Sequence, residues 1–399
     1  MKQRFCVVGA GIVGLATARA LAQTFPDSRI TVIEKEAAVA QHQSGHNSGV
    51  LHSGVYYPPN SLKAQLTRRG YRLLLEFCDQ QQIPYRLSGK LIVAQDASEL
   101  PQLEKLYAQG KQNGLQCELW EPDQFHEKEP YCRGIRALWV PEAGVVDFRR
   151  VARALQQWLL DRGHQILTNT TFLRAKEYPD AVEIATSQGE MVVDGFIACA
   201  GLYADVVAQR SGIAVPARIV PFRGEYYTLV PDKQYLCRGL IYPVPDPRFP
   251  FLGVHITRGI DGEVHCGPNA VLAFAREGYR WSVVRPSELW QTLRYSGTMH
   301  LIRRYWRTGV AEVVRSLSKR WFYRSVARLL REIAPEDLQR NESGVRAQLL
   351  LPNGQLYNDF FFKHRRRMLH VLNAPSPAAT ASLAIGEHIV QFFQEVLAG

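Results

Sequence analysis

The sequence predicts an α/β protein, α+β overall, in which a nucleotide-binding domain is assembled from separated stretches of the chain. Near the N-terminus, an apolar run leads into the glycine-rich turn Gly9–Gly14 and then into a helical pattern. Two later apolar runs, close to residues 197 and 370, also end in a short turn followed by a helical pattern. Between these pieces, Ile241–Val244 and Phe251–Thr257 are β-rich runs separated by proline and glycine, as is typical of antiparallel strands.

The composition is that of a globular protein with room for two domains. The chain has 399 residues, of which 46% are apolar and 21% charged. Its seven cysteines include no CxxC pair, which argues against a disulfide framework and favours a reducing compartment. Metal chemistry is not indicated, because no histidine motif with ligand spacing is present.

The N-terminal βαβ pattern is the first sign of a bound nucleotide. The glycines allow a tight turn and let a pyrophosphate approach bare backbone, while the following helix N-terminus attracts phosphate. The second strand, Ile30–Ile33, leads to an acidic residue that accepts hydrogen bonds from a ribose. An ordinary βαβ unit without a ligand is the alternative. The cofactor contacts expected here are Gly9, Gly11, Ile12, Val13, Gly14, Glu34 and Lys35.

The segment from Gln43 to Tyr57 favours a flavin over a nicotinamide, a choice that the glycine pattern leaves open. It combines small and hydrogen-bonding residues, whose backbone can approach both a pyrophosphate and the edge of a flavin ring. A polar surface loop is the alternative. The contacts expected from this loop are Ser44, His46, Asn47, Ser48 and Gly49.

Two downstream strand–turn–helix pieces complete the predicted nucleotide domain. The second of them would place a helix N-terminus beside the flavin, where it stabilises negative charge on the reduced ring. Taken singly, each piece is more often plain α/β architecture. Their expected cofactor contacts are Ala200, Gly201, Pro375, Ser376, Ala378, Ala379 and Thr380.

Several long motifs make the chain resemble a known family. These motifs are His42–Ala64, Pro221–Tyr227, Leu240–Arg258, Gly267–Tyr279, Gly344–Gln348 and Asn373–Gly386. On these motifs the chain resembles the L-2-hydroxyglutarate oxidase/dehydrogenase family of FAD-dependent oxidoreductases, within the D-amino-acid-oxidase-like group. The likeness runs through essentially the whole sequence.

The resemblance implies a fold and a reaction. It implies a discontinuous Rossmann-type FAD domain over residues 1–85, 145–215 and 340–399, and a substrate domain over residues 86–144 and 216–339 with a mixed, largely antiparallel sheet. The implied reaction oxidises L-2-hydroxyglutarate to 2-oxoglutarate by hydride transfer to flavin N5, with electrons passing on to quinone or O2. Alternatives are oxidation of another small 2-hydroxy acid, an amino acid or glycerol phosphate, and a membrane-associated protein with structural FAD.

Removing a hydride from a 2-hydroxy acid also requires a base for the hydroxyl proton. Histidine titrates nearest to neutral pH, and we expect His255 to be this base, with His52 beside the flavin loop as the second candidate. A histidine satisfied by packing is the alternative for each. Within a strand, residues 255 and 257 share a face, so Arg258 converges with His255 only if the strand ends near Thr257.

A dicarboxylate substrate needs cationic partners. Arg223, Arg258 and Arg346 are the candidates, because arginine binds carboxylate bidentately, and Tyr242 and Tyr226 offer hydroxyl donors. An ion pair on the surface or between domains is the usual alternative for each arginine.

The excess of positive charge is concentrated between Leu301 and Arg331, which carries +8 of the net +11. Apolar residues recur there at helical spacing: Ile302, Trp306, Val310, Val313, Leu317 and Trp321. Such a helix either lies on an anionic membrane or packs its apolar stripe on the core. No nucleic-acid partner is expected.

We also expect a cytoplasmic protein, with possible peripheral attachment to the inner face of the cell membrane. No apolar run reaches 18 residues. Lys2 and Arg4 before an apolar stretch imitate a secretory signal, but cleavage there would destroy the nucleotide-binding pattern.

Overall fold

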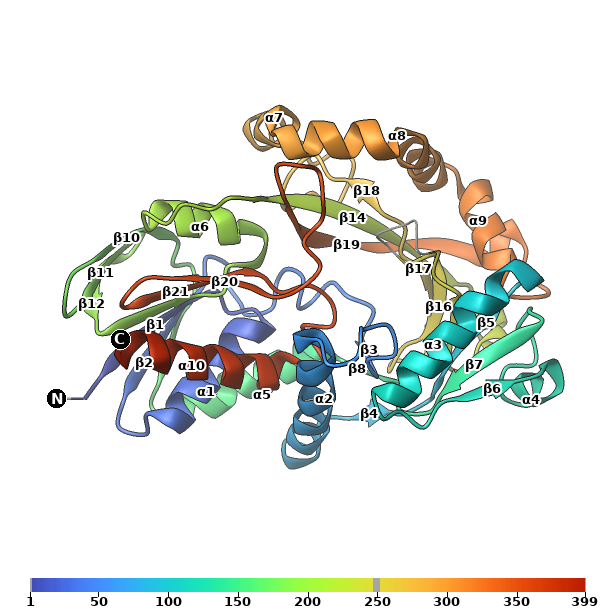
Figure 1. Ribbon diagram of the computed structural model, residues 1–399, viewed down its shortest axis with the longest axis horizontal. Helices are drawn as coiled ribbons and strands as arrows, with labels where there is room; N and C mark the ends of the chain where they lie inside the picture. Colours follow the sequence, from blue (N-terminus) through green and yellow to red (C-terminus); the bar gives the residue numbers. More distant parts are fainter. Residues whose placement is uncertain (1, 247–251, 399) are drawn as a thin grey trace.

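A computed structural model describes residues 2–246 and 252–398 and arranges them around two large sheets in the two halves of an elongated molecule (Figure 1). Phe251, the first residue of the expected strand 251–257, lies outside the described residues. The described part of that strand starts at His255.

The first half is a six-stranded sheet built from three separated stretches of chain. In spatial order its strands are β20 (Phe361–His364), β21 (Met368–Asn373), β13 (Gly195–Ala198), β1 (Arg4–Val8), β2 (Arg29–Ile33) and β9 (Gln165–Leu167). All neighbours are parallel except β20 and β21. The inner strands are apolar and almost wholly buried, as a parallel sheet covered on both faces requires.

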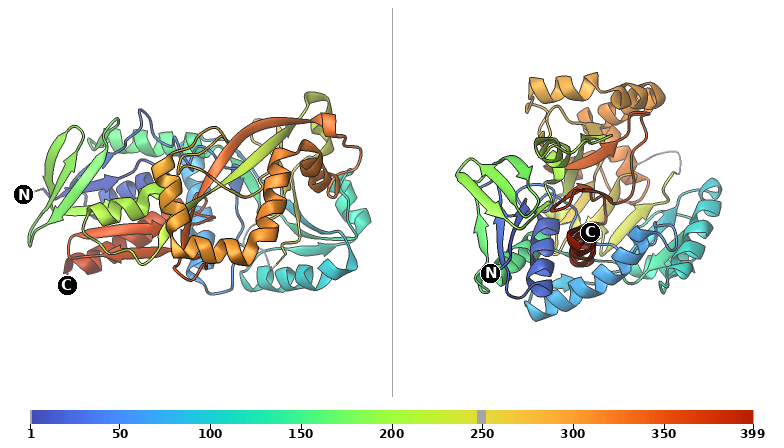
Figure 2. Two further views of the ribbon diagram at one scale, coloured as in Figure 1. Left: turned by 90° about the horizontal axis from the view of Figure 1, so that it is seen from above. Right: turned by 60° about the vertical axis from the view of Figure 1, so that its left-hand side comes forward.

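Helices cover one face of this sheet, and a small antiparallel sheet covers the other with one helix beside it (Figures 1 and 2). The helices of this half are α1 (Ile12–Thr24), α2 (Leu62–Gln80), α5 (Phe148–Leu160), α6 (Ala204–Arg210) and α10 (Ser382–Ala398). The small sheet consists of β10 (Phe172–Glu177), β11 (Val182–Thr186) and β12 (Gly189–Val193). The strands and helices expected in the three separated stretches are thus all present.

The second half contains a nine-stranded sheet. Its strands are β18 (Val271–Leu272), β14 (Arg218–Leu229), β17 (Val264–Gly267), β16 (His255–Arg258), β15 (Leu240–Pro243), β5 (Lys90–Ala94), β7 (Arg136–Val140), β6 (Glu118–Trp120) and β19 (Leu338–Leu350), which pairs with β14. Among the described strands, β5 and β15 are the parallel pair and the other neighbours are antiparallel. The mixed, largely antiparallel sheet is confirmed.

One stretch differs from the expected division of the chain. Residues 340–350 were expected in the nucleotide domain, but they lie in β19 and pair along β14 of the nine-stranded sheet. The reason is the length of these two strands, which pair from Arg218 with Leu350 to Leu229 with Leu338. One end of this ribbon therefore reaches the nucleotide half.

The remaining elements connect and cover the two sheets. They are the small sheet of β3 (Val50–Leu51), β8 (Gly144–Val146) and β4 (Tyr85–Arg86), and the helices α3 (Leu100–Gln112), α4 (Pro122–Lys128), α7 (Pro286–Arg294), α8 (Ser296–Leu317) and α9 (Lys319–Ala327). Among the described residues, no helix is both long and apolar enough to cross a membrane.

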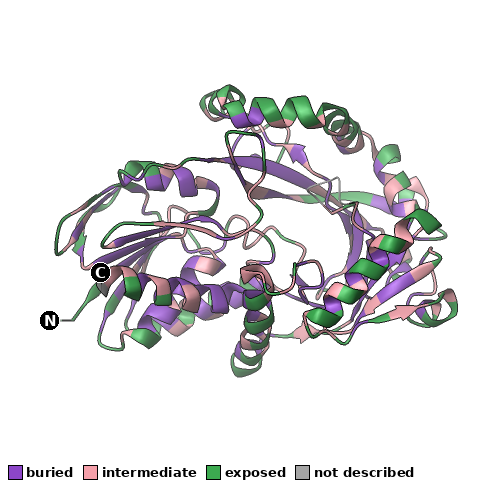
Figure 3. Ribbon diagram, in the orientation of Figure 1, coloured by how far each residue is buried: buried purple, intermediate pink, exposed green. Residues whose placement is uncertain are grey.

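Helices α7, α8 and α9 form an outer arm above β14 and β19 and are largely exposed (Figures 1 and 3). The apolar stripe of this arm points outward: Trp306 is 56% exposed, Leu317 60% and Trp321 51%. Packing of the whole stripe on the core, one of the two interpretations of this segment, is therefore wrong. The arm is attached instead by a few inward residues, such as Phe322 and Val326, both fully buried.

Candidate active site

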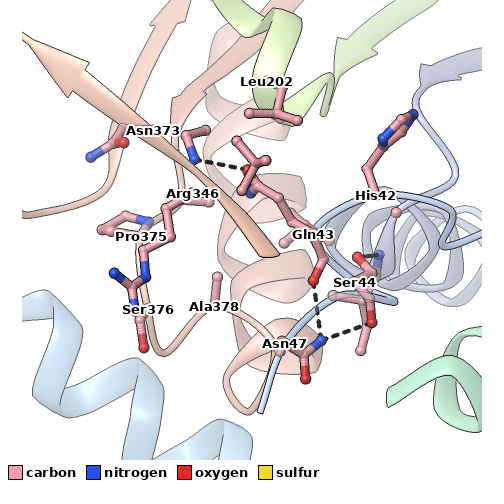
Figure 4. A pocket seen from close by; sticks show the side chains of 18 of the residues that line it. His42, Gln43, Ser44, Asn47, Leu202, Arg346, Asn373, Pro375, Ser376 and Ala378 are labelled. Atoms are coloured by element: carbon pink, nitrogen blue, oxygen red, sulfur yellow. Dashed lines mark hydrogen bonds between the residues drawn. The ribbon is translucent and has the colours of Figure 1, made fainter. Parts of the chain in front are cut away.

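A cavity of about 1450 Å³ extends from the carboxyl ends of β1 and β2 to the nine-stranded sheet. Figure 4 shows the loop that carries Gln43 and Asn47 on one side of it, and Pro375 and Ser376 on the other with the Arg346 side chain beside them. Three segments far apart in the sequence therefore meet around one space, at the strand ends where open α/β sheets bind ligands.

The glycine turn at one end of the cavity leaves no room for side chains. Gly9 has a φ of +98°, and a Cβ added there would lie 2.5 Å from the Cys199 carbonyl oxygen. A Cβ on Gly14 would overlap the Gly9 carbonyl oxygen. Both positions therefore require glycine, and the turn brings bare backbone to the cavity surface, as a pyrophosphate needs.

Glu34 is held in place where β2 ends. Its Oε2 accepts a hydrogen bond from the amide of Ala10 at 2.8 Å, and its Oε1 accepts one from the amide of Glu36 at 3.0 Å. A carboxylate has about four acceptor positions, so each oxygen keeps capacity for a ribose hydroxyl. Together, the turn and Glu34 fit the adenosine diphosphate part of a dinucleotide.

The other end of the cavity is built from side chains of the nine-stranded sheet and of the loop after β3. His255 on β16 is 5% exposed, and its ring stacks on Tyr242 of β15 with centroids 4.0 Å apart. His52 lines the same cavity. The stacking fixes the plane of the His255 ring.

The hydrogen bond of His255 determines which ring nitrogen is free. Its Nδ1 lies 3.1 Å from the carbonyl oxygen of Gly253, which can only accept. Nδ1 therefore carries the proton in the neutral ring, and Nε2 is left as a lone-pair acceptor.

Both histidines are neutral at physiological pH. Burial lowers the pKa of His255 to about 3, and Arg346 and Lys90 add to the effect. Burial likewise lowers the pKa of His52 to about 3, with contributions from Lys90, His255 and Lys63. Each imidazole can accept a proton, which is what a general base requires.

Arg346 on β19 supplies positive charge to this end of the cavity. It lines the cavity together with Tyr226 and Tyr242. Burial lowers its pKa from the ordinary value, and the two tyrosines and Glu312 act in the opposite direction. An arginine remains charged under such conditions, so this guanidinium can bind a carboxylate bidentately.

The residues expected to contact the cofactor line this cavity, apart from Gly49 and Thr380. Gly49 has a φ of +67° and shapes the turn before β3. Thr380 is fully buried; its Oγ1 accepts a hydrogen bond from the amide of His52 at 3.1 Å and donates one to the carbonyl of Val50 at 3.3 Å. Thr380 therefore positions the backbone of His52 and does not line the cavity itself.

Of the expected substrate residues, His52, His255, Tyr242 and Arg346 come together, whereas Arg223 and Arg258 do not line the cavity. Strand β16 continues through Arg258, so alternation directs this side chain to the other face, where Nη1 donates to the carbonyls of Gln234 and Cys237 at 3.3 Å.

Arg223 is also turned away from the cavity. It is 1% exposed, its guanidinium lies 4.1 Å from the ring centroid of Trp281, and it pairs with Glu225 at 3.4 Å. These contacts hold the arm-side loops against β14.

Two residues of the substrate end were not expected from the sequence. Tyr56 lines the cavity, and Lys90 lies behind it on β5 with its ammonium 4.5 Å from the Tyr56 ring centroid. A signal for Lys90 is present in the sequence: it is a charged residue at the start of the five-residue run KLIVA, all of which is buried.

The cavity combines a binding site for a dinucleotide with two neutral imidazoles and a buried guanidinium. The dinucleotide can accept two electrons, an imidazole can accept a proton, and the guanidinium can bind a small anion. These features define the class of dinucleotide-dependent oxidoreductases with separate cofactor and substrate sheets. The chain belongs to the DAO family of FAD dependent oxidoreductases, whose family model matches residues 4–392. Its cofactor is accordingly FAD.

Curated relatives are similar over nearly the whole chain. An L-2-hydroxyglutarate dehydrogenase from Indibacter alkaliphilus is 44% identical over 97% of this chain and 97% of its own length. One from Escherichia coli K12 is 42% identical over 99% of this chain and 94% of its own length, and the mitochondrial one from Homo sapiens is 44% identical over 98% and 88%.

Solved structures share the fold at low sequence identity. FAD-bound L-alpha-glycerophosphate oxidase from Mycoplasma pneumoniae has a TM-score of 0.80 at 21% identity, over 99% of this chain and 95% of that one. Glycine oxidase from Bacillus cereus has a TM-score of 0.70 at 17% identity, over 99% and 95%. Both support the fold alone.

Proposed function

We propose that this protein oxidises L-2-hydroxyglutarate to 2-oxoglutarate. The observation that carries the proposal is the convergence of His255 and Arg346 at one end of the FAD cavity. The relatives at 41–44% identity, all named L-2-hydroxyglutarate dehydrogenase, support this choice of substrate.

The geometry supports a role for each residue. Arg346 binds the carboxylate next to the hydroxyl-bearing carbon and so fixes the orientation of the substrate. Nε2 of His255 accepts the hydroxyl proton as the carbon is oxidised, and Tyr242 keeps the ring in position. FAD supplies the acceptor for the two electrons. His52 is the alternative base, because it lines the same end of the cavity.

The direct test is the absorption spectrum of the purified holoenzyme under anaerobic conditions. L-2-Hydroxyglutarate should bleach the flavin, whereas D-2-hydroxyglutarate, glycine and glycerol 3-phosphate should not. Bleaching by an amino acid or glycerol phosphate instead would assign the enzyme to another substrate class. A flavin that stays oxidised with every compound would mean that FAD is structural.

We further propose that the outer arm docks on an anionic membrane and that a membrane quinone reoxidises the flavin. Exposed apolar side chains of the arm include Trp290, which is 63% exposed, and Trp306 at 56%. Beside them Arg303, Arg304 and Arg307 are exposed, and none forms an ion pair with the described residues. Tryptophan with unpaired basic residues is typical of helices that lie in a membrane interface.

Vesicle co-sedimentation tests the docking, and turnover with a soluble quinone compared with air tests the acceptor. Each basic residue near an anionic surface contributes about 1 kcal/mol, so binding at low salt should weaken as salt screens it. The triple variant Arg303→Gln, Arg304→Gln and Arg307→Gln should lose binding.

A matched control removes three exposed arginines from outside the arm: Arg29→Gln, Arg72→Gln and Arg153→Gln. It should bind vesicles like the unchanged protein. If both triple variants bind equally, or if oxygen supports turnover as well as quinone does, the membrane proposal fails.

A further inference from the structure

Lys90 is a buried cation without a counter-ion in the described part of the chain. It is 1% exposed, and its backbone is paired in the sheet, yet no hydrogen bond or ion pair joins its ammonium to the described residues. Its ammonium lies 4.5 Å from the ring centroid of Tyr56 and 5.0 Å from that of Tyr242. Lysine is rarely buried without a partner, so this position needs a physical reason.

The groups facing Lys90 offer no negative charge. They are the phenols of Tyr56 and Tyr242, and beyond them the neutral His52 and His255 and the cationic Arg346. Burial alone lowers the pKa of Lys90 to about 7, and no nearby carboxylate raises it. The hydroxyl of Tyr56, which lines the cavity, is buried and has no hydrogen-bond partner among the described residues.

This end of the cavity therefore has two cations, Lys90 and Arg346, and an unused hydroxyl donor. Arg346 is sufficient for a monocarboxylate. The second cation and the Tyr56 hydroxyl are matched only by a ligand that carries a second negative charge.

We propose that Lys90 determines the preference of the enzyme for a dicarboxylate: it attracts the second carboxylate of the substrate across Tyr56 and Tyr242. This inference rests on the proposed function, which it deepens by assigning the recognition of that carboxylate. Lys90 does not itself line the cavity, so it is a positioning residue. The direct hydrogen bond to the carboxylate comes from Tyr56, and the charge behind that phenol strengthens it as a donor.

A dependence on pH follows. Lys90 is charged below its pKa of about 7 in the free enzyme and neutral above it. The affinity for a dicarboxylate should therefore fall as pH rises from 7 to 9, whereas the affinity for a monocarboxylate should not. A bound dicarboxylate favours the charged lysine, so binding at pH 8 should be accompanied by proton uptake.

The experiment compares Lys90→Met, Lys90→Arg and the control Lys111→Met in the FAD-loaded enzyme. Lys111 also lies over a tyrosine ring, that of Tyr107, but it is exposed and outside the cavity. Lys90→Met should raise KM for L-2-hydroxyglutarate roughly 10- to 100-fold, with a smaller effect on kcat. KM for L-2-hydroxybutyrate should be unchanged, and Lys111→Met should behave like the original enzyme.

Lys90→Arg tests the charge itself, and it keeps the proposal testable if Lys90→Met does not retain FAD. A guanidinium stays charged, so KM for L-2-hydroxyglutarate should no longer rise between pH 7 and 9. If KM rises with pH in the arginine variant as it does in the original enzyme, the proposal is wrong. Equal increases in KM for the dicarboxylate and the monocarboxylate in Lys90→Met would also overturn it.

Binding of glutarate and butyrate, followed by flavin absorbance, separates this proposal from the proposed function. Neither compound is oxidised, so the comparison holds even if L-2-hydroxyglutarate fails to bleach the flavin. A preference for glutarate that disappears in Lys90→Met supports the role of Lys90 independently of turnover. No preference for glutarate in the original enzyme would contradict that role.

Discussion

The two ends of the cavity are built in different ways. At the cofactor end, much of the surface is backbone, from glycines without room for a side chain and from the start of α1, and the Glu34 side chain beside it is held by two backbone amides. At the substrate end, side chains from β5, β15, β16 and β19 and from the loop after β3 converge, and most of them are titratable. Binding at the cofactor end depends on close approach of the pyrophosphate to the backbone, whereas the substrate end depends on the charge and protonation of its side chains.

This difference determines how each end responds to substitution. A surface made of backbone has no side chain that a substitution could remove, so cofactor binding is lost when a substitution adds an atom there. At a surface made of buried ionisable groups, substrate binding or catalysis is lost when a substitution removes a charge or a lone pair. The predictions below test this contrast.

The largest effect is expected from Gly14→Ala at the cofactor end. The added methyl group would overlap the Gly9 carbonyl oxygen and displace the glycine turn from the pyrophosphate. We expect the soluble protein to contain no FAD, as measured by the ratio of absorbance at the flavin band to that of the protein.

The matched control is Gly309→Ala on α8. A Cβ there meets nothing within 4 Å, and alanine favours a helix by about 1 kcal/mol over glycine. This variant should be fully yellow and slightly more stable. A Gly14→Ala protein with a full complement of FAD would contradict the close-approach argument.

The next largest effect is expected from His255→Ala at the substrate end. Loss of the base should lower the rate of anaerobic flavin reduction roughly 10²- to 10⁴-fold, while FAD remains bound. Stopped-flow absorbance measures this rate. Unchanged reduction would rule out His255, and the same loss in His52→Ala alone would make His52 the base.

Most of the residues expected at the cofactor end line the cavity, and those of the N-terminal piece could be grouped because they are close together in the sequence. Strand, glycines, helix and acidic residue follow one another within 34 residues, so spacing alone determines which of them meet. The residues expected there that do not line the cavity, Gly49 and Thr380, lie immediately behind its surface.

The substrate end was harder to predict, because its residues meet only through strand pairing and alternation. Arg258 was a candidate that depended on an early end of β16, and the strand continues through it. Arg223 faces Trp281 because of the register of β14, which no local pattern reveals. Lys90 was missed because a lysine at a strand end is usually exposed, and only the neighbouring tyrosines show that it is not.

A smaller effect, specific to substrate binding, is expected from Arg346→Met. Loss of the buried guanidinium leaves a substrate carboxylate unpaired and should raise KM roughly 10²-fold. Arg258→Met is the matched control: it removes an arginine whose contacts are backbone carbonyls outside the cavity. Steady-state kinetics should show little change in its KM. Equal increases in the two variants would contradict the placement of the carboxylate at Arg346.

The smallest effect is expected from a histidine that serves neither end. His370 on β21 is fully buried beneath the cofactor end but does not line the cavity, and neither ring nitrogen has a hydrogen-bond partner among the described residues. Burial lowers its pKa to about 4. His370→Leu removes a polar group that pays a desolvation cost without a partner, so at pH 7 it should raise the free energy of unfolding by about 1–2 kcal/mol.

The pH dependence of this gain in the free energy of unfolding tests whether it comes from the burial of the His370 imidazole. Because the pKa of His370 is lower in the folded protein than the ordinary 6.5, the unfolded chain binds more protons between pH 4 and 6.5, and acid destabilises the fold. Removing the histidine should therefore add about 2 kcal/mol more at pH 5 than at pH 7. Denaturant unfolding at saturating FAD measures both values. An equal gain at the two pH values would show that folding does not lower the pKa of His370. A loss of FAD affinity would show that His370 contributes to cofactor binding.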